Sequence, residues 1–454
     1  MQKNKTIYAL ASGQGVGGVA VLRLSGPASG AAIEALTRRA VPQARRTALR
    51  RLYDPESGAL LDEALVLSFD APASFTGEDC AELHVHGGRA VIDSVLLALS
   101  RLEGLRLAQA GEFTRRAFEN GRMDLTSAEA VADLVHAQTQ LQQQQALSQM
   151  GGALAALYEG WRRRLARFLA YAEAELDFPD EDLPDSLVAR LRPEIEKIMA
   201  EIADHLGDAR RGERIREGIQ VAIVGAPNAG KSSLLNALAQ RDVAIVNDLA
   251  GTTRDVLEVS LNLRGYPVLL YDTAGLRERL GDLDAHGVIE AEGIRRAMDK
   301  AREADITLLV FDAALLPHLD AETLALRDDR SLVLFNKSDC VVDRSIPNGV
   351  AGDVVGYFVS AKTGEGLDDV LSALCGRLEA VFAPRENVSL TRARHRDALE
   401  DCLTSLRSVC GGVLPDELLA EELRRCVASL GRITGRVDVE DLLDIIFRDF
   451  CIGK

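Results

Sequence analysis

The chain has 454 residues, too many for one ordinary hydrophobic core, so its length predicts about three domains. Its composition, 47% hydrophobic and 27% charged residues, excludes a disordered protein, and no apolar run approaches the roughly 18 residues that span a membrane. The net charge of −16 disfavours general nucleic-acid binding, because a phosphate backbone repels an anionic protein.

Any contact with RNA would therefore depend on local arginine clusters. Four clusters occur, at Arg45–Arg51 (RRTALRR), Arg162–Arg167 (RRRLAR), Arg210–Arg216 (RRGERIR) and Arg392–Arg396 (RARHR). A solvated helix face or loop is the expected explanation of any one cluster, and RNA contact stays open as the alternative.

The seven cysteines are scattered and include no CxxC pair, which indicates reduced thiols rather than a disulfide framework. The start, MQKNKTIYAL, has neither the charged-then-apolar build of a secretion signal nor the Arg- and Ser-rich character of a transit peptide. We therefore expect a cytoplasmic protein.

Residues 1–118 predict a mixed α/β domain. Strand-like apolar runs occupy Ile7–Ala11, Val19–Leu24, Leu65–Phe69 and Ala81–Val85. Glycine-rich breaks, GQGVGG and HGG, separate these runs, and helix-like stretches lie near residues 28–40 and 90–103.

From Asp124 the pattern becomes helical, with a Ser/Thr cap followed by Glu129 and no proline up to Met150. Helical spacing returns from Leu154 to Phe178, ends at an acidic loop with two prolines, and resumes to about residue 217. The chain after Pro384 is helical again but short for an independent core. We expect residues 119–215 and 384–454 to form one helical domain.

Residues 216–383 alternate strand and helix, the rhythm of a parallel sheet, and form the predicted insertion in that helical domain. The strand Val221–Val224 is followed by GAPNAGKS and then by a helix. This is the phosphate-binding loop in its required context: backbone amides meet the phosphates, Lys231 reaches the β- and γ-phosphates, and the Ser232 hydroxyl faces Mg²⁺.

Three further motifs follow strands and identify the base. Asp272 ends a strand and is the expected Mg²⁺-facing carboxylate, and Asp339 of NKSD can accept two hydrogen bonds from guanine, which adenine cannot supply. Thr253, in a loop that orders with the γ-phosphate, is the second expected Mg²⁺ hydroxyl. The remaining expected nucleotide contacts are Asn228, Ala229, Gly230, Ser233, Thr273, Ala274, Gly275, Asn336, Lys337, Ser360, Ala361 and Lys362.

The stretch LLYDTAGLRERL places Leu276 where the Ras-like scheme has a glutamine that orients water. Leucine cannot hydrogen-bond that water, so the sequence predicts either weak hydrolysis or another source of catalysis. Asn228 offers a neutral amide oxygen, a ligand suited to K⁺, and K⁺ could replace an arginine finger. Alternatively, Asn228 only holds the loop by side-chain hydrogen bonds.

Together, GAPNAGKSS, AGTTRD, DTAGLR and NKSD resemble the tRNA-modifying GTPase family MnmE, also called TrmE, as do SFTGEDCAELHVHGG, GEFTRRAFENGRMDL and the terminal FCIGK. The resemblance covers essentially the whole chain. It implies a K⁺-activated GTPase whose G domains dimerise across the nucleotide. The implied K⁺ ligands are Asn228, Asn247, Leu249 and Thr252, and the implied catalytic glutamate is Glu290, or Glu292 if the segment before it is longer than usual.

The same resemblance implies that the N-terminal domain dimerises and binds 5-formyl-tetrahydrofolate or a related one-carbon folate. The implied folate contacts are Arg23, Glu82, Arg122 and Lys454. Cys451 in CIGK is either a packed cysteine or, as the family implies, part of the modification centre. His84 and His86 are too few for a metal site and are expected to be structural.

The resemblance implies a function in which GTP hydrolysis drives a conformational cycle. With a flavin-dependent partner, MnmG, the protein would add a carboxymethylaminomethyl or aminomethyl group at carbon 5 of the wobble uridine of certain tRNAs. Two other classes remain open: a ribosome-assembly GTPase, which predicts a basic RNA-binding domain and no folate site, and a nucleotide-gated scaffold without hydrolysis.

Overall fold

The computed structural model describes residues 5–13, 15–177, 187–208, 210–241, 258–272, 302–342, 356–383, 388–411, 414–437, 443–444, 446–447, 450–451 and 453. They form two compact units: residues 1–132, 149–196 and 401–454 make the first, and residues 133–148 and 197–400 make the second. Among the described residues, none of the helices has the length and hydropathy of a membrane span.

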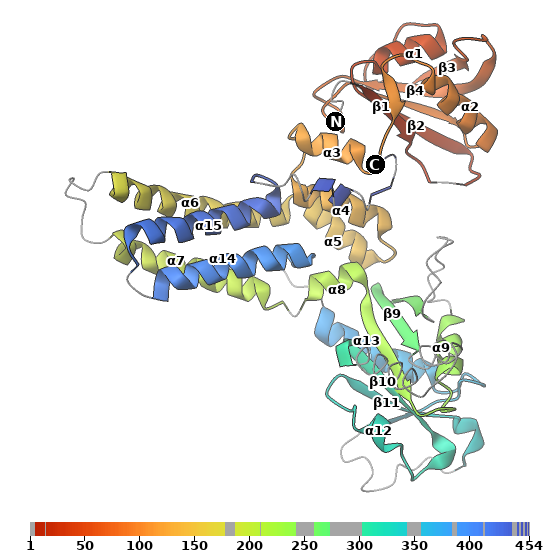
Figure 1. Cartoon of the computed structure of the whole chain (residues 1–454). Coiled ribbons are helices and arrows are strands. Elements are labelled where there is room, and N and C mark those ends of the chain that lie inside the picture. Colours follow the sequence, from red (N-terminus) through yellow and green to blue (C-terminus); the bar gives the residue numbers. More distant parts are fainter. Residues whose placement is uncertain are drawn as a thin grey trace, which may run out of the picture. The chain divides into compact units, whose positions relative to one another are not determined.

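The first unit begins with a six-stranded sheet in the order β3-β4-β5-β2-β1-β6 (Figure 1). All its strand pairs are antiparallel except β1 with β6. The strands are β1 (Thr6–Leu10), β2 (Val19–Ser25), β3 (Ala48–Tyr53), β4 (Leu60–Phe69), β5 (Cys80–His86) and β6 (Leu105–Leu107).

Two helices, α1 (Ser29–Thr37) and α2 (Arg89–Ser100), cover one face of this sheet. Alternate residues of the strands, such as Leu22 and Leu83, point into the core that these helices close. The other face is covered near β1, where Phe113 of α3 (Glu112–Glu119) packs on Ile7 and is fully buried.

Helices make up the rest of the first unit. α6 (Ala153–Asp177) packs along α15 (Asp416–Thr434), so segments far apart in sequence lie side by side (Figure 1). Tyr158 of α6 and Leu423 of α15 are both buried, and the ion pair Arg424–Glu173 joins the two helices at 2.9 Å. α4 (Leu125–His136), α7 (Leu187–Leu206) and α14 (Ala393–Gly411) each contribute residues to both units.

The second unit contains a six-stranded sheet in the order β12-β11-β10-β7-β9-β8, parallel except for β8 with β9. The strands are β7 (Ile219–Gly225), β8 (Glu258–Leu263), β9 (Tyr266–Asp272), β10 (Ile306–Asp312), β11 (Ser331–Asn336) and β12 (Gly356–Phe358). The helices are α5 (Gln140–Met150), α8 (Arg211–Glu217), α9 (Lys231–Ala239), α12 (Ala321–Leu324) and α13 (Leu367–Phe382), with short 3₁₀ turns η1 (Ala313–Leu315) and η2 (Ser338–Cys340).

The chain enters and leaves this sheet through one pair of segments, which we call the neck: residues 211–217, and the described parts of the returning segment, residues 381–383 and 388–391. Arg211 donates two hydrogen bonds to the Val381 carbonyl, at 3.1 and 2.8 Å, and Arg216 Nε donates to the Thr391 carbonyl at 3.1 Å. Gly212 passes so close to Leu390 that a Cβ there would lie 2.2 Å from its carbonyl oxygen. The two segments of the neck are therefore tightly paired.

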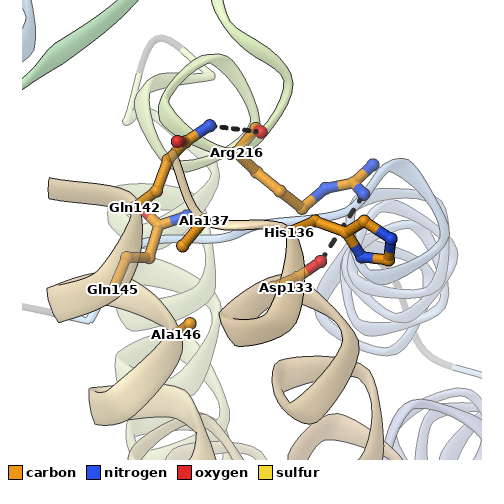
Figure 2. Close-up of a pocket in the computed structure, with 7 residues that line it drawn as sticks. All are labelled: Asp133, His136, Ala137, Gln142, Gln145, Ala146 and Arg216. Carbon is orange, nitrogen blue, oxygen red and sulfur yellow. Dashed lines mark hydrogen bonds and ion pairs between the residues drawn. The ribbon is translucent and has the colours of Figure 1, made fainter. Parts of the chain in front are cut away.

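A cavity of about 150 Å³ adjoins the neck (Figure 2). Its lining residues are Asp133, His136, Ala137, Gln142, Gln145, Ala146 and Arg216. Gln142 Nε2 donates to the Arg216 carbonyl at 3.1 Å, and the Arg216 guanidinium lies 3.8 Å from Asp133. The cavity thus lies among groups that already bond to one another.

Three local expectations are corrected by the structure. The predicted Ser/Thr cap is wrong: Asp124 caps α4, because its Oδ1 accepts the Ser127 N–H at 3.0 Å. The predicted continuous helix after Asp124 is two helices, α4 and α5, separated at residues 137–139. The arginine-rich cluster 45–51, expected to be a helix face or loop, includes most of strand β3.

Candidate functional site

The phosphate-binding loop connects β7 to α9, as the sequence predicts. Lys231 is the first residue of α9, and its Nζ lies over the loop, where it donates to the carbonyls of Gly225 and Ala226, each at 2.9 Å. Gly225 is required because a Cβ there would lie 2.3 Å from the Val310 carbonyl oxygen of the neighbouring strand. The strand can therefore turn into the loop without displacing β10.

Two oxygen ligands meet beside this loop. The Ser232 hydroxyl, at the start of α9, donates to Oδ2 of Asp272, the fully buried last residue of β9. Parallel pairing of β7 with β9 aligns Asp272 with Ile223, two residues before the loop begins. A hydroxyl and a carboxylate held together fit the oxygen-rich coordination that Mg²⁺ prefers.

The NKSD loop is bonded directly to the phosphate loop. Asn336 ends β11 and its Nδ2 donates to the Ala229 carbonyl at 2.8 Å, while its Oδ1 accepts the Ala361 N–H at 3.1 Å. Gly230 has φ 90°, and a Cβ there would lie 2.2 Å from Asn336 Nδ2. One buried side chain thus holds three of the motifs in a fixed arrangement.

Asp339 is set up to accept hydrogen bonds. The Ser360 hydroxyl donates to its Oδ1 at 2.6 Å, and this bond is the main reason that the pKa of the Asp339 carboxyl is lowered. Lys337, in the left-handed conformation with φ 64°, forms an ion pair with Asp312 at 2.7 Å. An ionised carboxylate held in this orientation beside the phosphate loop can accept the hydrogen bonds that the N–H groups of guanine donate.

Asn228 has left-handed backbone geometry, with φ 62°, and an exposed side chain. Its amide forms no hydrogen bond with any other residue that the structure describes. The interpretation that Asn228 holds the loop through its side chain therefore finds no support in this part of the chain.

A second polar group lies on the first unit's sheet. Arg23 on β2 faces Glu82 on β5 across the ladder, and its Nε and one terminal nitrogen donate to Glu82 Oε1 at 3.0 and 2.9 Å. His84 Nε2 lies 3.3 Å from the other carboxylate oxygen. The rings of Phe75 and Phe113 lie 5.3 and 5.9 Å from the guanidinium carbon of Arg23.

Of the other residues predicted for the N-terminal site, the structure describes Arg122 and Cys451. Arg122 packs on Gly77, in the same loop as Phe75, where a Cβ would lie 3.1 Å from the Arg122 side chain. The Cys451 side chain is exposed, and its carbonyl accepts the Gly111 N–H at 3.3 Å. Gly453 lies against the end of β1, so the CIGK tail and the strand beside Arg23 belong to one region.

Family models match almost the whole chain. The model described as GTP-binding protein TrmE N-terminus matches residues 6–122, and the model described as MnmE helical domain matches residues 125–451. The chain belongs to the MnmE family of tRNA modification GTPases. The expected fold class is confirmed: an α/β N-terminal domain, a helical domain and an inserted α/β P-loop GTPase domain. The expected enzyme class, a GTP hydrolase, is confirmed as well.

Full-length MnmE relatives agree. The tRNA modification GTPase MnmE of Parvibaculum lavamentivorans is 55% identical over 99% of this chain and 100% of its own length. The protein of the same name from Paramagnetospirillum magneticum is 52% identical over the same shares. A human mitochondrial protein named 5-taurinomethyluridine-[tRNA] synthase subunit GTPB3 is 46% identical over 99% of this chain and 93% of its own length.

Several residues expected from the nucleotide-site motifs or from the MnmE resemblance lie outside the described residues. They are Asn247, Leu249, Thr252, Thr253, Thr273, Ala274, Gly275, Leu276, Glu290, Glu292 and Lys454. Two residues of the N-terminal group were not predicted, Phe75 and Phe113. Both carried a signal, because Phe75 lies inside the family motif SFTGEDCAELHVHGG and Phe113 inside the family motif GEFTRRAFENGRMDL.

Proposed function

We propose that this chain is a K⁺-activated GTPase that modifies the wobble uridine of certain tRNAs together with a flavin-dependent partner, MnmG. The observation that carries the proposal is Asn336, which joins the phosphate loop to both base-recognition loops. Sequence relatives named for tRNA modification and for taurinomethyluridine synthesis support a uridine substrate. The product would be a carboxymethylaminomethyl or aminomethyl group at carbon 5, formed in the cytoplasm.

K⁺ is proposed as the catalytic cation because Asn228 presents a neutral oxygen at the phosphate loop. Neutral oxygens replace the hydration shell of K⁺ well, and Asn247, Leu249 and Thr252 would complete the set. The positive φ of Asn228 is a separate reason for asparagine here, since asparagine tolerates that conformation better than most residues. A useful variant must therefore keep the conformation and remove only the oxygen.

Hydrolysis also requires a group that acts on the attacking water, and Leu276 cannot serve. Glu290 is the proposed catalytic residue, with Glu292 as the alternative. The Ser232 hydroxyl and the Asp272 carboxylate would hold Mg²⁺, with Thr253 as the further hydroxyl. In this proposal Mg²⁺ and K⁺ neutralise the phosphate charge that develops during transfer, while Lys231 binds the same phosphates.

The N-terminal group fits a one-carbon folate by the chemistry of its donors and acceptors. Glu82 is a carboxylate fixed by Arg23 and could accept the paired N–H groups of a pterin ring, with Phe75 and Phe113 supplying aromatic surface. Arg122, together with Lys454, would meet the carboxylates of the folate tail. The folate supplies one carbon, and Cys451 lies in the tail segment beside this strand group.

A homodimer is proposed through the N-terminal sheet. The sheet face opposite α1 and α2 is open at β3 and β4, where Leu49 and Leu65 lie directly across the ladder and are 59% and 43% exposed. Val19, on the same face of β2, is 63% exposed. Neighbouring exposed apolar side chains of this kind are typical of a protein interface.

The first experiment measures GTP hydrolysis by the full chain in K⁺ and in Na⁺ at equal ionic strength. We expect strong acceleration by K⁺, loss of activity in Glu290→Ala, and retained activity in Glu292→Ala. Asn228→Gly allows the positive φ but removes the amide oxygen, so it should lose the K⁺ response and still bind GTP. A rate that ignores the cation would contradict the mechanism, and negligible hydrolysis with intact binding would support a scaffold.

The tRNA role needs its own readout. A tRNA transcript is incubated with this chain, the flavin-dependent partner, GTP, K⁺ and a one-carbon folate, and its nucleosides are analysed by mass spectrometry. A uridine modified at carbon 5 is the expected product, and Glu82→Gln should reduce its yield without changing GTP hydrolysis. If no modified uridine forms under any condition, a ribosome-assembly role becomes the better explanation of the G domain.

A further inference from the structure

Six arginines form a band at one edge of the N-terminal sheet: Arg38, Arg39, Arg45, Arg46, Arg50 and Arg51. We call them the arginine strip. Residues 38–51 contain these six arginines and no aspartate or glutamate, in a chain whose net charge is −16. The strip is therefore a local reversal of the protein's overall charge.

The strip runs from the end of α1 along β3, which is the edge strand of its sheet. Arg45 lies near one end, where its N–H donates to the Ser68 carbonyl at 2.8 Å and its guanidinium to the Ala73 carbonyl at 2.7 Å. Arg38 lies near the other end, with its guanidinium carbon 4.5 Å from the centre of the Tyr53 ring. The six residues of β3 alone span about 20 Å.

Most of the strip has no carboxylate partner. Arg51 pairs with Glu63 at 3.4 Å, through side chains that are both exposed. The other five arginines form no ion pair within the described part of the chain. The Nε of Arg50 is buried and has no hydrogen-bond partner there. Five guanidinium groups thus retain donors for another molecule.

The other three arginine clusters differ, because carboxylates of the chain neutralise them. Their ion pairs include Arg162–Glu159, Arg164–Glu194, Arg214–Asp305, Arg216–Glu217, Arg392–Asp133 and Arg396–Glu213, at 2.7 to 2.9 Å. These arginines stabilise helix and neck contacts. Among the described residues of the four clusters found in the sequence, the cluster within the strip is the one whose charge is largely unpaired.

We propose that the arginine strip binds the phosphate backbone of the tRNA substrate. This inference rests on the proposed tRNA function and names the surface that would hold the RNA. A guanidinium presents a fork of donors that matches two phosphate oxygens, and several such groups at one sheet edge can contact several phosphates. Each neutralised phosphate releases counterions, so the contact contributes affinity without sequence specificity.

A second explanation is that the arginines protect the edge strand from pairing with another sheet. Only Arg50 and Arg51 lie within β3, so protection explains two of the six. The remaining four lie on the helix end and the connecting loop, where they block no strand edge. This difference lets one experiment separate the two explanations.

The experiment measures binding of the full chain to an unmodified tRNA transcript across a range of salt concentrations. The test variant is Arg39→Gln/Arg45→Gln/Arg46→Gln. The control is Arg89→Gln/Arg424→Gln/Arg425→Gln, which removes the same charge from exposed arginines that have carboxylate partners. Three lost phosphate contacts should weaken binding about tenfold or more and flatten the slope of log K against log salt by about 2.

The control should retain the wild-type slope, and both variants should retain K⁺-stimulated hydrolysis. Equal slopes of log K against log salt in the two variants would overturn the proposal. Aggregation or a changed oligomeric state of the test variant, with unchanged affinity for RNA, would also overturn it. Absence of tRNA binding by the wild-type chain would also overturn it, while nucleoside analysis with the partner would still judge the modification role. Conversely, the test variant could show the flatter salt dependence of tRNA binding while the nucleoside analysis finds no modified uridine. That result would support RNA binding by the arginine strip and refute the proposed function.

Discussion

Asp339 shows how one hydrogen bond can determine what a carboxylate recognises. The Ser360 hydroxyl lies 2.6 Å from its Oδ1, which both orients the carboxylate and lowers its pKa. Because the pKa is lowered, the group is ionised at neutral pH and becomes protonated only as the pH falls well into the acid range. It therefore presents acceptors, and no donor, to a bound group, as the expected recognition of guanine requires.

Replacing Asp339 by asparagine should change the preferred base. The amide would offer one acceptor and one donor, so it would lose a charge-assisted bond to guanine, and GTP should bind roughly a hundredfold more weakly. Xanthine carries an oxygen where guanine has its amino group, so affinity for xanthosine triphosphate should rise. Titrations with fluorescent derivatives of GTP and of xanthosine triphosphate measure the two affinities.

The matched control is Asp329→Asn, which changes an exposed carboxylate elsewhere in the same unit. It should leave both affinities unchanged. Equal loss of the two nucleotides in Asp339→Asn would mean that the residue supports the loop rather than reading the base.

At the scale of single elements, α4 depends on the cap that the sequence pattern misplaced. Asp124 accepts the Ser127 N–H and the Thr126 and Ser127 hydroxyls, at 2.6 to 3.0 Å. A Ser/Thr cap followed by glutamate was a reasonable expectation, but those hydroxyls donate to the aspartate instead of capping the helix themselves. Both an aspartate cap and a Ser/Thr cap fit the sequence DLTSAE, so only the structure distinguishes them.

Asp124→Ala should loosen the first turn of α4. Loss of an N-cap costs about 1 kcal/mol, so the amide of Ser127 should exchange with deuterium about fivefold faster. Asp124→Asn keeps the acceptor and should exchange almost as slowly as the wild type. Equal acceleration in both variants would show that charge near the helix end, rather than the cap bond, holds this turn. Hydrogen-exchange mass spectrometry of residues 119–136 provides the measurement.

Strand β3 marks the limit of sequence patterns in this chain. In ALRRLY only Leu52 is fully buried, so the segment has too few core residues to register as a strand. It forms a strand because it pairs with the backbone of β4. This pairing is a tertiary contact, so the local spacing of apolar residues does not predict it. By contrast, the buried strands β7, β10 and β11 have continuous apolar runs, and β7 and β11 were predicted.

Some residues of the candidate site could likewise be predicted from the sequence, and some of its contacts could not. The motifs that follow strands β7, β9 and β11 identify Lys231, Asp272 and Asp339 from the sequence, because ligands in α/β sheets gather at these ends. The bond from Asn336 to the Ala229 carbonyl could not be predicted, since it depends on the spacing of two loops. The aromatic contact of Phe113 with Arg23 is likewise tertiary.

For the whole molecule, the neck implies that the G domain is an independent folding unit. Every fully packed member of its two hydrophobic clusters lies between Ile219 and Phe382. Among the residues that the structure describes, Leu141 is the one from outside this range that packs against them, and it is half-buried. The core therefore closes without the rest of the chain.

Residues 216–383 alone should fold and bind GTP with an affinity close to that of the full chain. Circular dichroism and nucleotide titration of this segment test the expectation, with Lys231→Ala as the negative control for phosphate binding. A segment that remains unfolded would show that Leu141 and the neck contribute stability that the cluster membership does not reveal. A folded segment would confirm the expected boundaries of the insertion.

The paired segments of the neck also have a mechanical meaning. Along the covalent chain, tension applied at the two ends enters the G domain through the neck, whose segments are joined by the hydrogen bonds of Arg211 and Arg216. The load passes across these bonds before it can stretch β7 or α13. The nucleotide-binding domain is therefore shielded from pulling forces for as long as the hydrogen bonds between the two neck segments remain intact.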